Sequence, residues 1–148
     1  ISTFTATVAS SLTSQNIRSH VSGISDLGRL RVGAVDGNNP ITLLRRQGIV
    51  ARGFPNLELA LTSLAEGQLE AVVHDRPIIQ HTIRINPELA TSIGLTGFNL
   101  RKEEYGIAIR VPADPNQRNT MMDQINIALL KIKTSGRYDE ILGQYLGF

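Results

Sequence analysis

Two short polar stretches, each placed directly after an apolar run, carry the side chains best suited to bind a ligand. The stretch "DGNN" follows "LRVGAV", and Asp75 follows "EAVVH". In the first stretch Gly37 permits a tight turn, so that the amides of Asn38 and Asn39 can face a carboxylate or a phosphate. In the second, the carboxylate of Asp75 can accept hydrogen bonds from an ammonium group. An anion site beside a cation site suits a zwitterion such as an amino acid.

Each stretch also has a purely structural interpretation. "DGNN" could serve only as the turn that caps a helix beginning at Pro40. Asp75 could serve only as the N-cap of a helix beginning near Pro77. The first stretch lacks the Lys-Ser or Lys-Thr pair of a P-loop, so a nucleoside triphosphate is not predicted there. From the residues alone, the ligand-binding and the capping interpretations both stay open.

Other kinds of chemistry find no support in the sequence. The chain has no cysteine, which excludes disulfides, thiolate catalysis and thiolate-bound zinc. His74 and His81 are seven residues apart without an acidic third ligand nearby, and no Gly-x-Ser-x-Gly elbow occurs. The net charge is only +2, and the basic residues are scattered rather than clustered. We therefore expect no catalytic residue, no metal, no cofactor and no nucleic-acid partner.

The elements that must position these residues alternate between strand and helix. Apolar or β-branched runs predict strands at 30–35, 50–54, 70–75, 91–97 and 105–111. Helices are predicted at 40–47, 55–68, 77–85 and 138–148, with a long one from about Gln117. Asn39 and Asn56 are the expected N-caps of the first two helices, and Gly48 and Gly67 are their expected stops. Strands separated by helices of this length predict an α/β fold with an open sheet.

Four segments carry a family resemblance. "RVGAVDGNNPITLL", "NLELALTSLAEGQLEAVVHDRP", "EEYGIAIRV" and "INIALLKIKTSGRYDEILGQYLG", in this order, resemble the second half of type II periplasmic amino-acid-binding domains. The resemblance implies a periplasmic-binding-protein-like II lobe, an open mixed sheet with helices on both faces. It also implies that residues 24–104 form the second lobe of a ligand-binding domain. Residues 105–148 would be the return strand and the C-terminal helices that belong to the first lobe.

The same resemblance implies roles for particular residues. A turn in this family binds the ligand carboxylate, which carries over to Gly37, Asn38 and Asn39, although asparagines stand here where the family has hydroxyl residues. An acidic residue after the third strand binds the α-amino group, which carries over to Asp75. The arginine that binds the α-carboxylate in this family would lie before residue 1, in a first lobe that we expect to be missing from these residues.

The opening stretch carries a second resemblance. "TFTATVASSLTSQ" is similar to the segment that ends the third membrane helix of ionotropic glutamate receptors, where it precedes the second half of the ligand-binding domain. Residues 1–23 are therefore expected to be the end of a pore-helix-like segment and a linker. The resemblance implies a glutamate-like amino acid as ligand, a gated ion channel as parent protein, an extracytoplasmic (periplasmic or extracellular) domain, and a homo-oligomer. No run reaches the roughly 18 apolar residues that cross a bilayer, so the channel's membrane segments would also lie elsewhere.

Two other functions remain open on the same fold. The chain could belong to the amino-acid-binding subunit of an ABC importer, and sequence upstream of Ile1 would distinguish that from a channel. It could also belong to a dehydratase-like enzyme, for which Asp75 or His74 would be the candidate acid or base. The long predicted helix carries an apolar stripe that comprises Met121, Ile125, Leu129 and Ile132. In a channel or an importer subunit, this stripe and the apolar residues Ile141 and Leu142 are expected to have no full-sized partner within this chain. Such exposed apolar side chains are expected to promote self-association.

Overall fold

The chain separates into two compact units. The computed structural model describes residues 2–11, 21–110 and 113–146. The first unit comprises Ile1–Tyr105 and the second Gly106–Phe148. Both residue stretches singled out by the sequence lie in the first unit.

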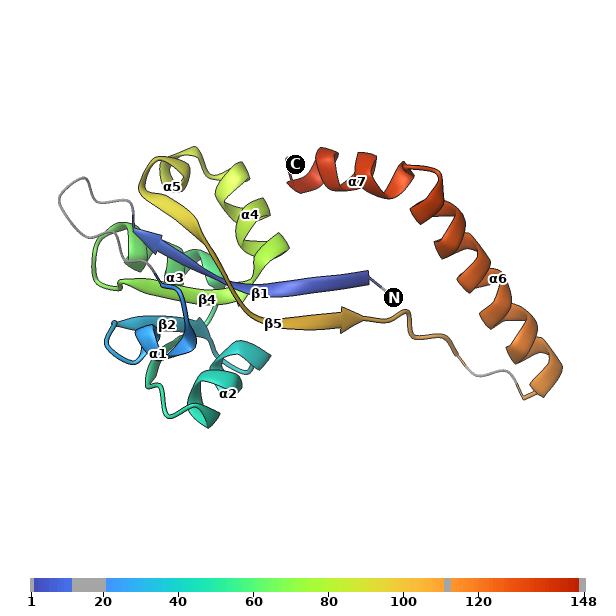
Figure 1. Cartoon of the computed structure of the whole chain (residues 1–148), viewed down its shortest axis with the longest axis horizontal. Coiled ribbons are helices and arrows are strands. Elements are labelled where there is room, and N and C mark those ends of the chain that lie inside the picture. Colours follow the sequence, from blue (N-terminus) through green and yellow to red (C-terminus); the bar gives the residue numbers. More distant parts are fainter. Residues whose placement is uncertain (1, 12–20, 111–112, 147–148) are drawn as a thin grey trace. The chain divides into compact units, whose positions relative to one another are not determined.

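A five-stranded mixed sheet forms the centre of the first unit (Figure 1). Its strands, in chain order, are β1 (Ser2–Ser11), β2 (Val32–Val35), β3 (Ala51–Phe54), β4 (Ala71–Asp75) and β5 (Ile93–Tyr105). The spatial order is β3-β2-β4-β1-β5. Strand β2 runs parallel to its neighbours β3 and β4, whereas β1 runs antiparallel to β4 and β5. The predicted open mixed sheet is confirmed.

Five helices follow the strands of this unit. They are α1 (Ile24–Leu27), α2 (Asn39–Arg46), α3 (Leu57–Ala65), α4 (Arg76–Ile85) and α5 (Pro87–Ser92). The cap of α3 is as predicted, because the Asn56 side chain accepts a hydrogen bond from the Leu59 N–H. The cap of α2 is Asn38 rather than the predicted Asn39. Gly37 makes the turn with a φ of 77°, so the residue directly after it is already the helix cap.

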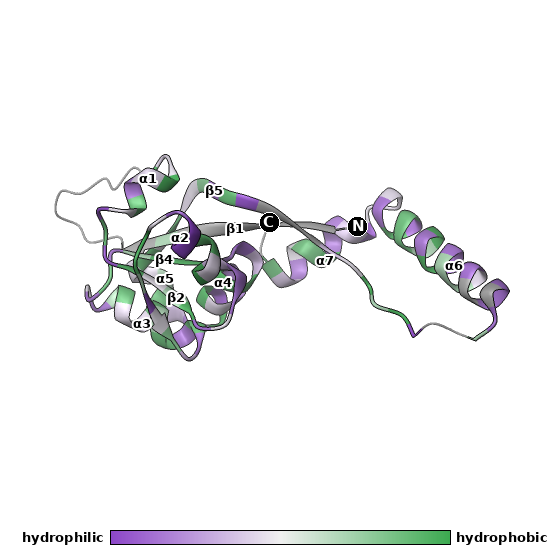
Figure 2. Ribbon diagram, turned by 90° about the horizontal axis from the view of Figure 1, so that it is seen from below, coloured by the Kyte–Doolittle hydropathy of each residue, from purple (hydrophilic) through white to green (hydrophobic). Residues whose placement is uncertain are grey.

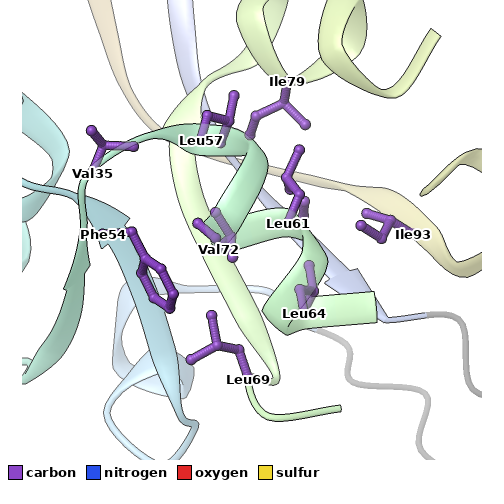
Figure 3. Close-up of a cluster of buried hydrophobic side chains, with 11 residues drawn as sticks. Val35, Phe54, Leu57, Leu61, Leu64, Leu69, Val72, Ile79 and Ile93 are labelled. Carbon is purple, nitrogen blue, oxygen red and sulfur yellow. The ribbon is translucent and has the colours of Figure 1, made fainter. Parts of the chain in front are cut away.

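The core lies on both faces of the sheet. Neighbouring residues of a strand point to opposite faces, and in β4 Val72 packs on one face while Ala71 and Val73 pack on the other. Helix α3 covers the first face, where Leu61 and Leu64 are fully buried (Figure 3). On the other face the buried cluster includes residues of α1 and α2. The prediction of helices on both faces is therefore confirmed.

The opening stretch is a strand and not the end of a helix. Strand β1 pairs with β4 through registers such as Ala6 with Asp75, and with β5 through registers such as Ser2 with Tyr105. Threonines at positions 3, 5 and 7 alternate with apolar residues at 4, 6 and 8, and this period-two pattern of β-branched and apolar residues favours a strand. The expected helical conformation is wrong for Ser2–Ser11. This segment with alternating residues pairs with β4 on one side and with β5 on the other, which stabilises it as a strand. Thr13 lies outside the described residues.

The expected return strand also differs. Strand β5 occupies Ile93–Tyr105, so the strand predicted at 91–97 is present but much longer. Residues 106–110 have no regular structure. A strand requires a partner for its backbone N–H and C=O groups, and no described strand pairs with this segment.

The second unit consists of two helices. Helix α6 (Pro115–Thr134) begins after the N-cap Asp114, whose side chain accepts a hydrogen bond from the Asn116 N–H. Helix α7 (Arg137–Leu146) follows Gly136, which has a φ of 77°. Both predicted helices are confirmed, and apolar and polar residues are interspersed along each (Figure 2). None of the helices in the described ranges is long and apolar enough to cross a membrane.

Candidate ligand-binding site

The ends of β2 and β4 bring the two predicted stretches together. Because the two strands are parallel neighbours, their carboxyl ends meet at one edge of the sheet, where ligands bind in open α/β folds. A pocket of about 380 Å³ lies there; its lining comprises Asn38, Asn39, Pro40, His74, Asp75, Ile78 and Tyr105. Three of the four predicted site residues thus line one pocket, and Gly37 lies next to it in the chain without lining it.

The turn after β2 is shaped by its backbone. The Asn38 N–H donates to the Val35 carbonyl at 3.4 Å, and Gly37 adopts the left-handed conformation that disfavours other residues. A Cβ added at Gly37 would meet no protein atom within 4 Å. Glycine is therefore favoured at position 37 because of its backbone conformation. A side chain added there would not clash with other atoms of the protein. Asp36 takes no part in the pocket, because its side chain lies against Gly53 of β3.

The first turn of α2 offers unpaired backbone donors to the pocket. The first N–H groups of an α-helix have no partner within the helix, and the helix dipole places partial positive charge beside them. Asn39 is the first residue of α2, and Asn38, its cap, makes no capping hydrogen bond with its side chain. This wall of the pocket is chemically suited to an anion.

Asp75 supplies the opposite charge. It is the last residue of β4 and the residue before α4, yet its side chain makes no capping hydrogen bond. Instead its Oδ2 accepts a 2.6 Å hydrogen bond from the Tyr105 hydroxyl. The interpretation of Asp75 as a helix cap alone is therefore wrong. Sequence analysis did not associate Tyr105 with the site, because it lies 30 positions further along the chain and is brought there only by the pairing of β5 in the sheet.

His74 forms the floor between the two charged regions. Only 6% of its surface is exposed. Its Nδ1 accepts a 2.8 Å hydrogen bond from the Asp75 N–H, and its Nε2 lies 3.1 Å from the Asn38 side-chain nitrogen. Burial lowers the pKa of His74, and the neighbouring Asp75 charge and the bond from the Asp75 backbone only partly oppose that effect. The ring is accordingly neutral at pH 7 and connects the two predicted stretches.

A second pocket among the described residues is less suited to an amino acid. A larger pocket of about 610 Å³ lies elsewhere in the first unit; it is lined by Glu58, Thr62, Ala65, Glu66, Asn86, Pro87, Glu88 and Leu89. It has carboxylates but no cationic side chain, so it does not suit a zwitterion. Within the described parts of the chain, no three His, Cys, Asp or Glu side chains lie close enough to hold a metal ion.

Several curated proteins are similar to this chain, whereas no protein-family model matches it. A probable histidine-binding protein of Neisseria gonorrhoeae is 30% identical over 130 residues, which is 84% of this chain and 46% of that protein. The ABC transporter glutamine-binding protein GlnH of Bacillus subtilis (strain 168) is 30% identical over 131 residues, or 86% of this chain and 45% of GlnH. The chain thus spans about half the length of the curated relatives it matches.

Solved structures decide the fold. The ligand-binding core of GluR0 in complex with L-glutamate superposes with a TM-score of 0.76 at 23% identity, over 98% of this chain and 61% of that one. The fold is that of a periplasmic-binding-protein-like amino-acid-binding domain. Substrate-binding domain 2 of Lactococcus lactis GlnP, in its open conformation, has a TM-score of 0.72 at 21% identity, covering 99% of this chain and 60% of that one. The fold class expected from the sequence is confirmed, and its neighbours include both GluR0 and transporter binding domains.

Proposed function

We propose that this chain contributes one lobe of a two-lobed amino-acid-binding domain. The observation that carries the proposal is the single pocket that contains both the first turn of α2 and the Asp75 carboxylate. The ligand carboxylate binds beside Asn38 and Asn39, where backbone donors and the helix dipole favour negative charge. The ligand ammonium binds Asp75 at the carboxylate oxygen that Tyr105 does not hold.

The second unit fits the same proposal as part of the other lobe. Residues 106–110 have no regular structure and no partner strand among the described residues, and the apolar side chains of α6 include Leu130, 61% exposed. Such a segment gains a partner if it returns to a second sheet. In that arrangement residues 24–104 belong to the second lobe, as expected from the resemblance, and the described pocket is half of a cleft.

The parent protein is proposed to use ligand binding as a signal. The sequence of the opening stretch resembles the end of a receptor membrane helix, although Ser2–Ser11 is a strand here. The GluR0 ligand-binding core has a TM-score of 0.76 to the chain. A ligand that contacts this lobe only in the closed domain shifts the equilibrium toward closure by its difference in affinity for the two states. This supports an amino-acid-gated channel with an extracytoplasmic ligand-binding domain.

An importer subunit is the second candidate, and the two curated relatives favour it because both carry the names of amino-acid-binding proteins. In both candidates the chemistry is binding. The sequence that precedes Ile1 in the gene distinguishes them: a pore loop with hydrophobic spans supports the channel, and a continuous soluble lobe supports the importer.

Calorimetric titration of the full-length protein with L-glutamate, L-glutamine and L-histidine tests the proposal. We expect at least one to bind, and Asp75→Ala to weaken that binding by more than tenfold, because a charge-assisted hydrogen bond contributes about 1.5 to 3 kcal/mol. Glu58→Gln, which removes a carboxylate from the other pocket, is the matched control and should bind normally. Unchanged affinity in Asp75→Ala would contradict the assignment of this pocket.

A further inference from the structure

His74 has two ring nitrogens with two different partners. Its Nδ1 faces the Asp75 N–H at 2.8 Å, and its Nε2 faces the Asn38 amide at 3.1 Å. A neutral imidazole has one nitrogen that donates and one that accepts. The backbone N–H of Asp75 can only donate, so Nδ1 must be the accepting nitrogen. The proton therefore resides on Nε2.

This tautomer determines which end of the Asn38 amide faces the ring. A donating Nε2–H requires an acceptor, and the Asn38 side chain has one acceptor, its Oδ1, and one donor, its Nδ2. With Nδ2 toward the ring, two donors would face each other across 3.1 Å. A rotation of the amide by about 180° exchanges its nearly isosteric oxygen and nitrogen and leaves its shape unchanged. The hydrogen-bonding pattern is satisfied only when Oδ1 accepts from Nε2–H.

We propose that His74 is a positioning residue that holds the Asn38 amide with its oxygen toward the imidazole and its NH₂ group toward the pocket, so that this NH₂ group donates to a ligand carboxylate. The inference rests on the proposed function for the identity of the ligand group, but the amide orientation stands on the ring geometry alone. Asn38 is available for this role because its side chain does not cap α2. The ring is held in place because it is almost completely buried and its Nδ1 is bound to the backbone.

The arrangement also explains how asparagine can replace a hydroxyl residue in such a turn. A serine or threonine hydroxyl rotates and can donate without help. An amide presents either end, and the orientation with its oxygen outward would repel a carboxylate. The buried imidazole removes that ambiguity, because its proton on Nε2 selects one of the two orientations.

The first test is the tautomer of His74, measured by long-range proton–nitrogen NMR on the full chain with ¹⁵N-labelled histidine. We expect the Nε2–H tautomer at pH 7, with the signal assigned by its absence in His74→Gln. The Nδ1–H tautomer would overturn the proposal. This measurement requires no ligand, so it decides the amide orientation even if no amino acid binds and the proposed function fails.

The second test compares four variants of the full-length protein by L-glutamate titration calorimetry. Asn38→Asp keeps an oxygen toward Nε2–H but replaces the NH₂ group by a second oxygen, and His74→Leu removes the ring donor. We expect each to lose more than tenfold in affinity. His74→Gln keeps an N–H donor near the position of Nε2 and should stay within about threefold of the parent protein. Glu58→Gln, which lies in the other pocket, should also bind like the parent protein.

Two results of this comparison would overturn the proposal: parental affinity in Asn38→Asp, or equal losses in His74→Gln and His74→Leu. The second result would mean that the imidazole serves only to fill space. Thermal unfolding of each variant separates loss of the site from loss of the fold, and a variant with a lowered transition temperature is titrated at a temperature where it is fully folded.

Discussion

The Tyr105 hydroxyl donates a 2.6 Å hydrogen bond to Oδ2 of Asp75 and so joins the last residue of β5 to the last residue of β4. These strands are not neighbours, because β1 lies between them. The bond therefore crosses over the end of a third strand, and it holds one of the two oxygens of the Asp75 carboxylate.

Tyr105→Phe should weaken amino-acid binding by about fivefold, which corresponds to the roughly 1 kcal/mol that a typical hydrogen bond contributes. The loss should be smaller than for Asp75→Ala, because the carboxylate itself remains. Calorimetry on the full-length protein measures both. Tyr145→Phe removes a hydroxyl from the exposed side chain of α7 and should leave affinity unchanged. A loss in Tyr105→Phe as large as that in Asp75→Ala would show that the hydroxyl contacts the ligand directly.

Gly37→Ala should lower the free energy of unfolding by about 1 to 2 kcal/mol, because a left-handed conformation is unfavourable for residues with a Cβ. Gly67→Ala is a close match, since Gly67 has a φ of 76° and, like Gly37, open space around an added Cβ. Urea unfolding should give similar losses for the two variants. Only Gly37→Ala, next to the pocket, should also weaken binding. Weaker binding in both variants would mean that affinity follows global stability instead.

Leu61→Ala should cost about 2 to 5 kcal/mol of unfolding free energy, the range found for buried leucines. Leu61 is fully buried against the sheet, whereas Leu59, two positions earlier on α3, is 50% exposed. Leu59→Ala should therefore change stability by less than about 0.5 kcal/mol. Chemical denaturation of the two variants compares the faces of one helix, and equal losses would contradict the packing of α3 on the sheet.

Stability should decrease as the pH falls below about 6.5, the ordinary pKa of histidine. Burial lowers the pKa of His74 in the folded chain, so between that lowered value and 6.5 the unfolded chain binds a proton that the folded chain does not. The stabilisation is complete above pH 6.5 and is lost progressively as the pH approaches the folded-state pKa, by at most about 1.4 kcal/mol per pH unit. His74→Gln should flatten this part of the pH profile, and His81→Gln, at an exposed position, should not. An unchanged profile in His74→Gln would assign the dependence to other groups.

The 148-residue chain by itself should self-associate and should bind free amino acid weakly or not at all. Apolar side chains of α6 and α7 are exposed, including Met122 at 46%, Ile127 at 54% and Tyr145 at 55%. Exposed apolar surfaces of this kind tend to associate with other chains. Sedimentation at tens of micromolar, with Ile127→Glu as a variant expected to reduce association, measures the effect. A monomer at that concentration, or micromolar affinity for an amino acid, would contradict the proposal that another lobe completes the site.

The predictable parts of this molecule are those in which local pattern and tertiary environment agree. Helix α3 was predictable with its cap because Asn56 and a 3.6-residue apolar stripe specify the same start. The meeting of Asn38 with Asp75 followed from the parallel order of their strands. The contacts that these two residues make were not predictable from sequence spacing. His74 contacts Asn38 because it is buried at the site, and Tyr105 contacts Asp75 because of the long-range pairing of its strand. The strand in the opening stretch is hard to recognise from sequence, because small hydroxylated residues also occur in membrane helices; its conformation follows from its pairing with β4 and β5.

The position of β1 between β4 and β5 has a consequence for how the chain acquires its structure. Its partners in β4 and β5 follow roughly 60 to 100 residues later in the chain, and such distant pairings slow folding. Until β5 is made, one edge of β1 has no partner strand and can pair with the equivalent segment of another copy. The parallel strands β3, β2 and β4 with α2 and α3 can assemble earlier and form the pocket floor first. Pairing of β5 with β1 then brings Tyr105 to Asp75, so the hydrogen bond between these two side chains forms after the rest of the pocket.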